Sequence, residues 1–136
     1  MTSTVVVDTN VIVRFLTQVP IDQYTRAVAL MQQASTGEVE LHLSAAVVAE
    51  VAAVLHHTYK RPQAVVADKL LQLVNARGVF VEEEDVVRQS LEYSRTLTDT
   101  DFIDAYVAVR ARSEGFQVAS FDKGLHKRLG TTIYPL

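Results

Sequence analysis

The stretch "TVVVDTNVIVRF", residues 4–15, joins a run of β-branched residues to an apolar pattern with helical spacing. Three consecutive valines are typical of a strand that is buried on both faces, as strands of a parallel sheet are. Between the two patterns lie Asp8, Thr9 and Asn10, which are residue types that accept hydrogen bonds at the start of a helix. The stretch therefore predicts a strand, a carboxylate and then a helix. A helix cap alone would explain Asp8, so its meaning depends on whether other carboxylates reach the same place.

The rest of the chain repeats this alternation. Strands are predicted at 4–7, 40–43, 79–82, 117–121 and 132–134, and helices at 11–17, 22–35, 45–59, 62–76, 84–95, 101–113 and 123–129. Alternating strands and helices predict an α/β fold with a parallel sheet that helices cover on both faces. In such sheets ligands bind beyond the carboxyl ends of the strands, where the strand order reverses. Asp8 is expected at one such end.

Length and composition limit the function classes. A chain of 136 residues, about half of them apolar, suits one domain over residues 1–136. The absence of cysteine excludes a disulfide scaffold and a thiolate metal site. The net charge of −3 gives no overall attraction for nucleic acid. With no signal-like start and no apolar run of membrane-spanning length, we expect a cytoplasmic protein without a membrane partner.

Glu50 is the single charged residue in the apolar run of the segment "SAAVVAEVAAVLHH", residues 44–57. A helix that is apolar all round is buried, and a carboxylate on it is costly unless it is paired or bound to a metal. We therefore expect Glu50 to have a partner. The alternative is a position at the helix edge, where the side chain reaches water or an arginine.

Further carboxylates follow in the C-terminal third of the chain. Asp101 and Asp104 are three residues apart, so they share a face near the start of the predicted helix. Asp101 could be only a helix cap, whereas Asp104 lies beside the apolar stripe that follows it. Asp122 comes directly after a predicted strand, although an ordinary turn with Gly124 also explains it. Taken together, these residues predict several carboxylates at one edge of the sheet.

Such a carboxylate cluster favours a metal site. Like charges repel, and divalent cations neutralise them. Oxygen ligands without cysteine or histidine favour Mg²⁺ or Mn²⁺ over zinc. Cations held in this way suit in-line displacement at a phosphodiester. The sequence therefore predicts phosphodiester hydrolysis with Asp8 as the central ligand.

Four segments carry a resemblance that runs nearly from end to end: "VVVDTNVIVRFL", "SAAVVAEV", "DFIDAYVAVRA" and "VASFDKGL". In this order they resemble the PIN-domain ribonucleases, and the small size of the chain resembles the VapC toxins of toxin–antitoxin pairs. The resemblance implies a three-layer α/β/α sandwich with a parallel sheet of about five strands in the order 3-2-1-4-5. It also implies RNA cleavage with Mg²⁺ or Mn²⁺, homodimerisation, and neutralisation by a cognate antitoxin, which could give a toxin–antitoxin hetero-oligomer.

The resemblance also assigns roles to individual residues. The catalytic and metal-binding positions are Asp8, Glu50, Asp104 and Asp122. Asp101 matches an auxiliary ligand, and Thr9 and Asn10 match a "DTN" signature that orients Asp8 or caps the next helix. Ser120 stands where the family carries a hydroxyl that could hold a water or a phosphate oxygen.

Basic residues and histidines leave other possibilities open. A cluster next to Asp122, formed by Lys123, His126, Lys127 and Arg128, could contact RNA phosphates or be a solvated helix end. His56 and His57 are adjacent on a helix and cannot both face one acid–base site. Apolar residues on helices 11–17 and 22–35 could pack in the core or form a groove for an antitoxin helix.

Two other functions remain as alternatives. A haloacid-dehalogenase-like phosphatase also has an aspartate after its first strand, but it has a second aspartate two residues later, where this chain has Asn10. A non-enzymatic interaction module with the same fold would bind a partner through its surface. Its partner binding would persist after Asp8→Asn.

Overall fold

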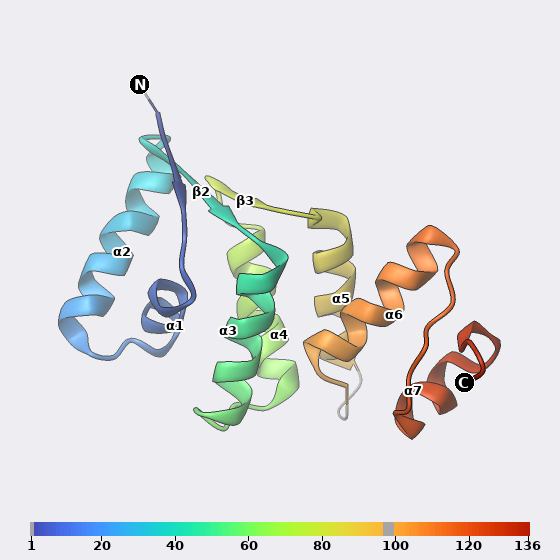
Figure 1. Ribbon diagram of the computed structural model, residues 1–136. Coiled ribbons are helices and arrows are strands. Elements are labelled where there is room, and N and C mark those ends of the chain that lie inside the picture. Colours follow the sequence, from blue (N-terminus) through green and yellow to red (C-terminus); the bar gives the residue numbers. More distant parts are fainter. Residues whose placement is uncertain (1, 97–99) are drawn as a thin grey trace.

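The computed structural model describes residues 2–96 and 100–136 (Figure 1). The strands are β1 (Ser3–Val6), β2 (Val39–Leu43) and β3 (Val79–Val81). The helices are α1 (Thr9–Thr17), α2 (Ile21–Thr36), α3 (Ala45–His57), α4 (Gln63–Val74), α5 (Glu84–Thr96), α6 (Phe102–Glu114) and α7 (Lys123–Leu129), followed by a 3₁₀ turn at Gly130–Thr132. Each helix predicted from the sequence is present, with its ends within two residues of those expected.

The sheet is parallel and confirms the α/β class. Its strands lie in the order β1-β2-β3, with Thr4 beside Glu40 and Leu41 beside Val79. This is the 3-2-1 part of the predicted order. Side chains alternate between the two faces of a strand, so Leu41 and Leu43 enter the core while His42 points the other way, where its ring stacks on Phe80.

The prediction of strands at 117–121 and 132–134 is wrong. Among the described residues these segments form only one isolated parallel bridge, between Val118 and Ile133. The Val118 N–H donates to the Thr132 carbonyl at 2.8 Å, and the Tyr134 N–H donates to the Val118 carbonyl at 2.7 Å. In Figure 1 these segments lie beside α7, at the opposite end of the molecule from β1, with α3, α4 and α5 between. Without a neighbouring ladder they do not become strands, and β1 forms a ladder only with β2 in the described part of the chain.

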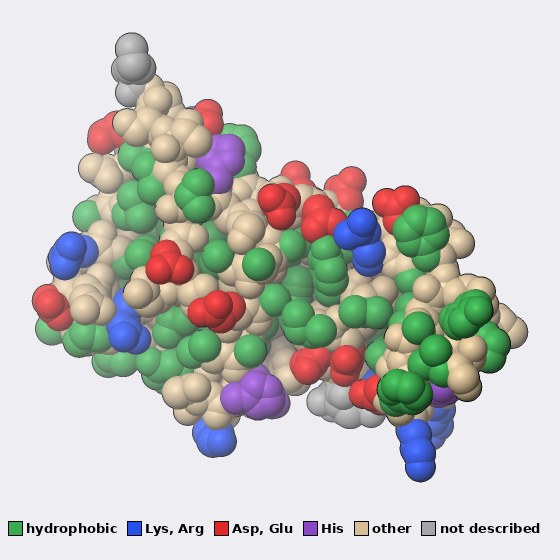
Figure 2. All heavy atoms as spheres, in the orientation of Figure 1, with side chains coloured by type: hydrophobic (Ala, Val, Ile, Leu, Met, Phe, Trp, Pro, Cys, Tyr) green, Lys and Arg blue, Asp and Glu red, His purple; other side chains and the backbone are tan. Residues whose placement is uncertain are grey.

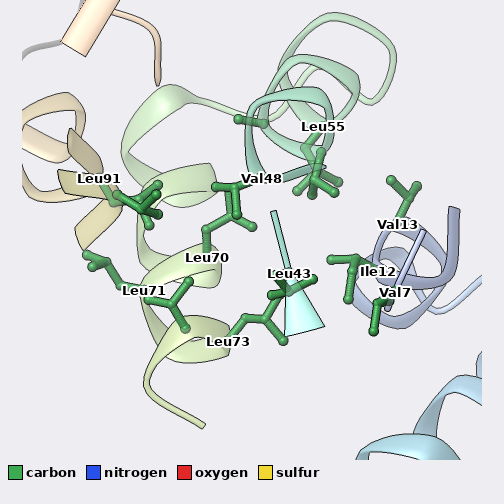
Figure 3. Close-up of a cluster of buried hydrophobic side chains, with 14 of the residues drawn as sticks. Val7, Ile12, Val13, Leu43, Val48, Leu55, Leu70, Leu71, Leu73 and Leu91 are labelled. Atoms are coloured by element: carbon green, nitrogen blue, oxygen red, sulfur yellow. The ribbon is translucent and has the colours of Figure 1, made fainter. Parts of the chain in front are cut away.

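Two apolar cores correspond to these two ends. The larger core joins the sheet to α1, α3, α4 and α5 through side chains such as Val7, Leu43, Leu70 and Leu91 (Figure 3). Full burial of one such side chain contributes roughly 1.5–3 kcal/mol. The smaller core consists of Ala108, Ala111, Val118, Leu125 and Leu129. The C-terminal segments therefore pack on α6 and not on the sheet.

Polar contacts fasten α6 to the start of α5. The Tyr106 hydroxyl donates to Glu83 at 2.6 Å, and the Arg110 guanidinium donates to the same carboxylate at 3.1 Å. The hydrogen bond to Glu83 is the main cause of a raised pKa of Tyr106. On the next turn, the Arg112 guanidinium lies 6.0 Å from the centre of the Tyr93 ring of α5. The position of α6 is thus set by contacts along its whole length.

Candidate active site

Asp8 stands at the junction between β1 and α1, as the opening stretch predicts. It is the N-cap of α1, and its Oδ1 accepts a hydrogen bond from the Thr9 N–H at 2.8 Å. The Asp8 side chain is exposed, Thr9 is buried, and Asn10 is exposed. Asp8 is therefore both a structural cap and an accessible carboxylate at the carboxyl end of a strand.

Glu50 is exposed, so the expectation that it is buried is wrong and the edge position is correct. It shares an exposed stripe of α3 with Ala46, Ala53 and His57. Because of these alanines the sequence of the helix is apolar on all sides. An alanine side chain is small, however, so its exposure to solvent has little free-energy cost. Glu50 therefore needs no buried partner.

Asp101, Asp104 and Asp122 form a second acidic group at the starts of α6 and α7, and Asp101 lines a small hollow together with Ala49 and Ala53 of α3. Asp101 is the N-cap of α6, and its Oδ1 accepts from the Asp104 N–H at 2.8 Å. Asp122 is the N-cap of α7, where Oδ1 accepts from the Gly124 N–H at 2.7 Å and the Leu125 N–H at 3.2 Å. The cap interpretation of Asp101 and Asp122 is thus confirmed, and Asp8 has the same role on α1.

The electrostatics of this group centre on Asp104, which is half-buried. Burial raises the pKa of Asp104, and the carboxylates of Asp101 and Asp122 raise it further, while the Arg128 guanidinium opposes these effects. Desolvation and repulsion therefore both disfavour the charged form of Asp104. Unfavourably placed charges of this kind are typical of functional sites.

The residues around Asp122 have mainly structural contacts. The Ser120 hydroxyl accepts from the Asp122 N–H at 2.9 Å, and a ring nitrogen of His126 lies within hydrogen-bond distance of the Ser120 carbonyl. Arg128 donates to the hydroxyl of Thr100, a buried residue that no pattern in the sequence singled out. Of the predicted RNA-binding cluster, Lys123 and Lys127 are exposed.

The predicted quartet does not converge within one chain. Asp8 lies at the junction of β1 and α1 and Glu50 on the exposed face of α3, while Asp104 lies at the start of α6, which packs beside α3, and Asp122 lies at the start of α7 (Figure 1). Figure 2 shows acidic side chains of this face in separate groups. Over residues 2–96 and 100–136, no group of three or more histidine, cysteine, aspartate or glutamate side chains is placed to hold a metal ion. The donor types suit Mg²⁺ or Mn²⁺, but their arrangement in a single chain does not.

Comparison with known families decides the classification. The family model named PIN domain matches residues 5–130. The chain belongs to the PIN domain family. The match extends from β1 to the end of α7, so it includes each of the candidate carboxylates. A search of curated proteins and a search of solved structures each gave no match.

Family membership gives the coarse function. The PIN fold is a three-layer α/β/α sandwich, and PIN domains are generally nucleases that hydrolyse phosphodiesters and typically use divalent cations. None of the described helices has the length and apolar character needed to cross a bilayer.

A groove between α1 and α2 is lined by polar and apolar residues that include Asn10, Val11, Arg14, Arg26 and Leu30.

Proposed function

We propose that this PIN domain is a Mg²⁺- or Mn²⁺-dependent ribonuclease that serves as the toxin of a toxin–antitoxin pair. The observation that carries the proposal is the family match over residues 5–130 together with the four acidic residues of the predicted quartet. Asp8, Glu50, Asp104 and Asp122 are the proposed catalytic carboxylates, and Asp101 is an auxiliary one. Their all-oxygen donor set is the reason for proposing a hard cation.

Exposure supports the assignment of these carboxylates to a polymeric substrate. Asp8, Glu50 and Asp122 are exposed and Asp104 is half-buried, so none lies in a closed cavity that would exclude RNA. Lys123 and Lys127 follow Asp122 on an exposed face of α7 and could contact phosphates. Ser120 and Asn10 lie two residues from Asp122 and Asp8 and are proposed to orient these carboxylates or the substrate.

The proposed antitoxin site is the groove between α1 and α2. Arg14 and Arg26 line it beside Val11 and Leu30, a combination that suits a helix with apolar residues and acidic flanks. A toxin held by such a partner would be part of a hetero-oligomer. We also propose that the protein is located in the cytoplasm and forms a homodimer.

A second candidate function is a non-enzymatic interaction module. The absence of a metal-binding group of acids among the described residues of one chain favours it. This alternative keeps the PIN fold and uses the surface, including the groove between α1 and α2, for partner binding.

Cleavage of a mixed RNA pool distinguishes the two functions. The pool is incubated with the purified chain in Mg²⁺, in Mn²⁺ or in EDTA, beside Asp8→Asn and a matched control, Asp22→Asn, which alters an exposed acid in the first turn of α2. We expect cleavage only with a cation, unchanged in Asp22→Asn and reduced about 100-fold or more in Asp8→Asn, as for loss of a group that a metal site needs. Equal cleavage by both variants, or cleavage in EDTA, would contradict the proposal.

A further inference from the structure

The turn between α3 and α4 carries two adjacent cationic side chains on a fixed backbone. The Arg61 N–H donates to the Leu55 carbonyl at 3.0 Å, and the His56 Nδ1 lies 2.9 Å from the Arg61 carbonyl oxygen. Lys60, with φ 57°, has the left-handed backbone conformation that turns the chain out of α3. These hydrogen bonds use the Arg61 backbone, so the side chains of Lys60 and Arg61 are both exposed to solvent.

Arg61 and Lys69 line the same small hollow between α1, α3 and α4. The rest of its lining is mostly apolar and consists of Leu16, Thr17, Leu55, Val65 and Val66. With a volume of about 10 Å³ the hollow has room for about one water molecule, so a side chain of another protein does not fit in it. Two cations at one hollow repel each other, and an anion at its mouth relieves that repulsion.

Acidic side chains of the chain do not neutralise these cations. Over residues 2–96 and 100–136, none of the ion pairs involves Lys60, Arg61 or Lys69. Asp68 precedes Lys69, but its carboxylate lies 3.6 Å from the Arg95 guanidinium of α5. Successive residues of a helix point about 100° apart, so Asp68 faces α5 while Lys69 faces the hollow. The positive charge of Arg61 and Lys69 is therefore accessible to an external anion.

The same turn reaches the acidic start of α6. A second hollow, of about 20 Å³, is lined by His56 and His57 at the end of α3 and by Asp101 at the start of α6. Figure 2 shows histidine and basic side chains at the lower end of this face, where α3 ends in Figure 1, with acidic side chains to their right. Asp104 follows Asp101 by one turn of α6. A line of bases thus runs from α4 along the turn to the candidate carboxylates.

We infer that this basic strip binds the phosphate backbone of RNA and leads it to the carboxylates at the start of α6. The strip consists of His56, His57, Lys60, Arg61 and Lys69. The inference rests on the proposed ribonuclease function and adds a substrate-binding surface to it. This surface is separate from Lys123 and Lys127 of α7.

The chemistry of the basic strip suits phosphates. Arg61 has a planar guanidinium that can form two parallel hydrogen bonds with one phosphate, and the lysines add point charges. The exposed His57 ring has N–H groups for a phosphate and a face for a base. Both hollows have room for little more than a water molecule, so they cannot receive the apolar anchors of a docked protein helix. Because the net charge is −3, RNA binding needs a local group of bases such as this one.

RNA binding in EDTA tests the basic strip without reference to cleavage. The fluorescence anisotropy of a labelled single-stranded oligouridylate gives the dissociation constant. The matched control for Arg61→Gln is Arg77→Gln, which removes an exposed guanidinium beyond the other end of α4. The 12 residues of α4 span about 18 Å, and the Debye length at about 0.1 M salt is roughly 10 Å, so Arg77 has little influence on the strip.

We expect Arg61→Gln to weaken RNA binding roughly threefold to tenfold, as for loss of one phosphate contact. Arg77→Gln should leave the dissociation constant unchanged. Equal weakening by the two variants, no weakening by Arg61→Gln, or a wild type that binds no RNA would overturn the inference. Tighter binding of polyglutamate than of RNA by the wild type would also overturn it, because the strip would then suit an acidic protein.

The salt dependence of binding measures the number of phosphate contacts. For single strands the logarithm of the binding constant falls against the logarithm of salt concentration with a slope of about −0.7 per contact. Replacement of Lys60, Arg61 and Lys69 together by glutamine should therefore make the slope shallower by about 2. An unchanged slope would overturn the inference even if affinity fell, because the loss would then not come from phosphate contacts.

Cleavage kinetics separate this inference from the proposed function. In an active ribonuclease Arg61→Gln should raise KM and leave kcat unchanged, because a contact with a remote phosphate is the same in substrate and transition state. A lower kcat with unchanged KM would overturn the strip's role in binding. A wild type that binds RNA through the strip but cleaves none in Mg²⁺ or Mn²⁺ would refute the ribonuclease and leave the binding surface supported.

Discussion

Substitution of Gly78 by alanine is expected to destabilise the sheet strongly. Gly78 lies just before β3 with φ +83°, and an added Cβ would stand 2.3 Å from the Ala34 carbonyl oxygen and 2.7 Å from its carbon, both in the backbone of α2. Backbone atoms cannot rotate away as a side chain can. Relief of the contact requires α2 and β3 to separate, which disturbs the buried Ala34 side chain and the bond from the Leu41 N–H to the Gly78 carbonyl at 2.8 Å.

The magnitude follows from comparison with Gly37. That residue has φ +86° with nothing within 4 Å of an added Cβ, so Gly37→Ala has the conformational penalty alone. A left-handed alanine costs roughly 1–2 kcal/mol, partly offset by the lower entropy of the unfolded chain, which leaves about 1 kcal/mol. Overpacking adds roughly 1–3 kcal/mol, so Gly78→Ala should lose about 3 kcal/mol.

Circular dichroism measures both variants: urea unfolding gives the loss of unfolding free energy, and thermal unfolding gives the change in melting temperature. At roughly 3–5 °C per kcal/mol for a chain of this size, the melting temperature should fall by about 10 °C for Gly78→Ala and about 3–5 °C for Gly37→Ala. Equal losses in the two variants would refute the reasoning, because the close approach of α2 and β3 would then have no energetic effect.

Substitutions at three other residues are expected to have smaller effects. Asp104→Asn should raise the melting temperature by about 2 °C at pH 7, since it removes the desolvation of a charged carboxylate and its solvent-screened repulsion with Asp101 and Asp122, together about 0.5 kcal/mol. Because the pKa of Asp104 is raised in the folded state, this gain should vanish as the pH falls below the unfolded-state value of 3.8, and a gain that persists there would contradict the cause. Asp122→Ala should lose about 1 kcal/mol in urea unfolding through its cap, whereas Asp122→Asn should stay within about 0.5 kcal/mol, and equal losses would exclude a capping role. Tyr106→Phe should lose about 1 kcal/mol by the same measurement if the bond to Glu83 secures α6, with no such loss expected from the same change when Glu83→Ala has already removed the acceptor.

The helices were predictable because their signals are local. Asp101 and Asp122 cap α6 and α7 as their residue type suggests, and Gly115 ends α6 in the left-handed conformation. That the segment 117–121 forms no strand was not predictable, because a strand exists only where a partner strand lies beside it, and here Val118 makes only one bridge, to Ile133. Periodicity indicates which side chains are apolar, but it does not indicate which strands pair with each other.

The site shows the same division between local and distant information. The exposure of Glu50 was open to two interpretations because alanine is compatible with core and surface alike. Asp8, Asp101 and Asp104 were placed correctly on their local elements, since each position follows from the adjoining strand or helix pattern. Whether they meet depends on how the C-terminal part is placed against the sheet. That placement is set by contacts such as Glu83 with Tyr106, which no motif indicates.

Asp8, Asp101 and Asp122 cap helices, and the proposed function assigns chemistry to the same side chains. Each accepts a backbone N–H at the start of a helix with one carboxylate oxygen, which leaves the second oxygen for a ligand or substrate. An asparagine keeps the accepting oxygen and removes the charge. Loss of cleavage in an Asp→Asn variant that unfolds at the wild-type urea concentration therefore measures the charge and not the cap. Alanine at the same positions removes both, so the difference between the two substitutions separates what each carboxylate does for the fold from what it does for the reaction.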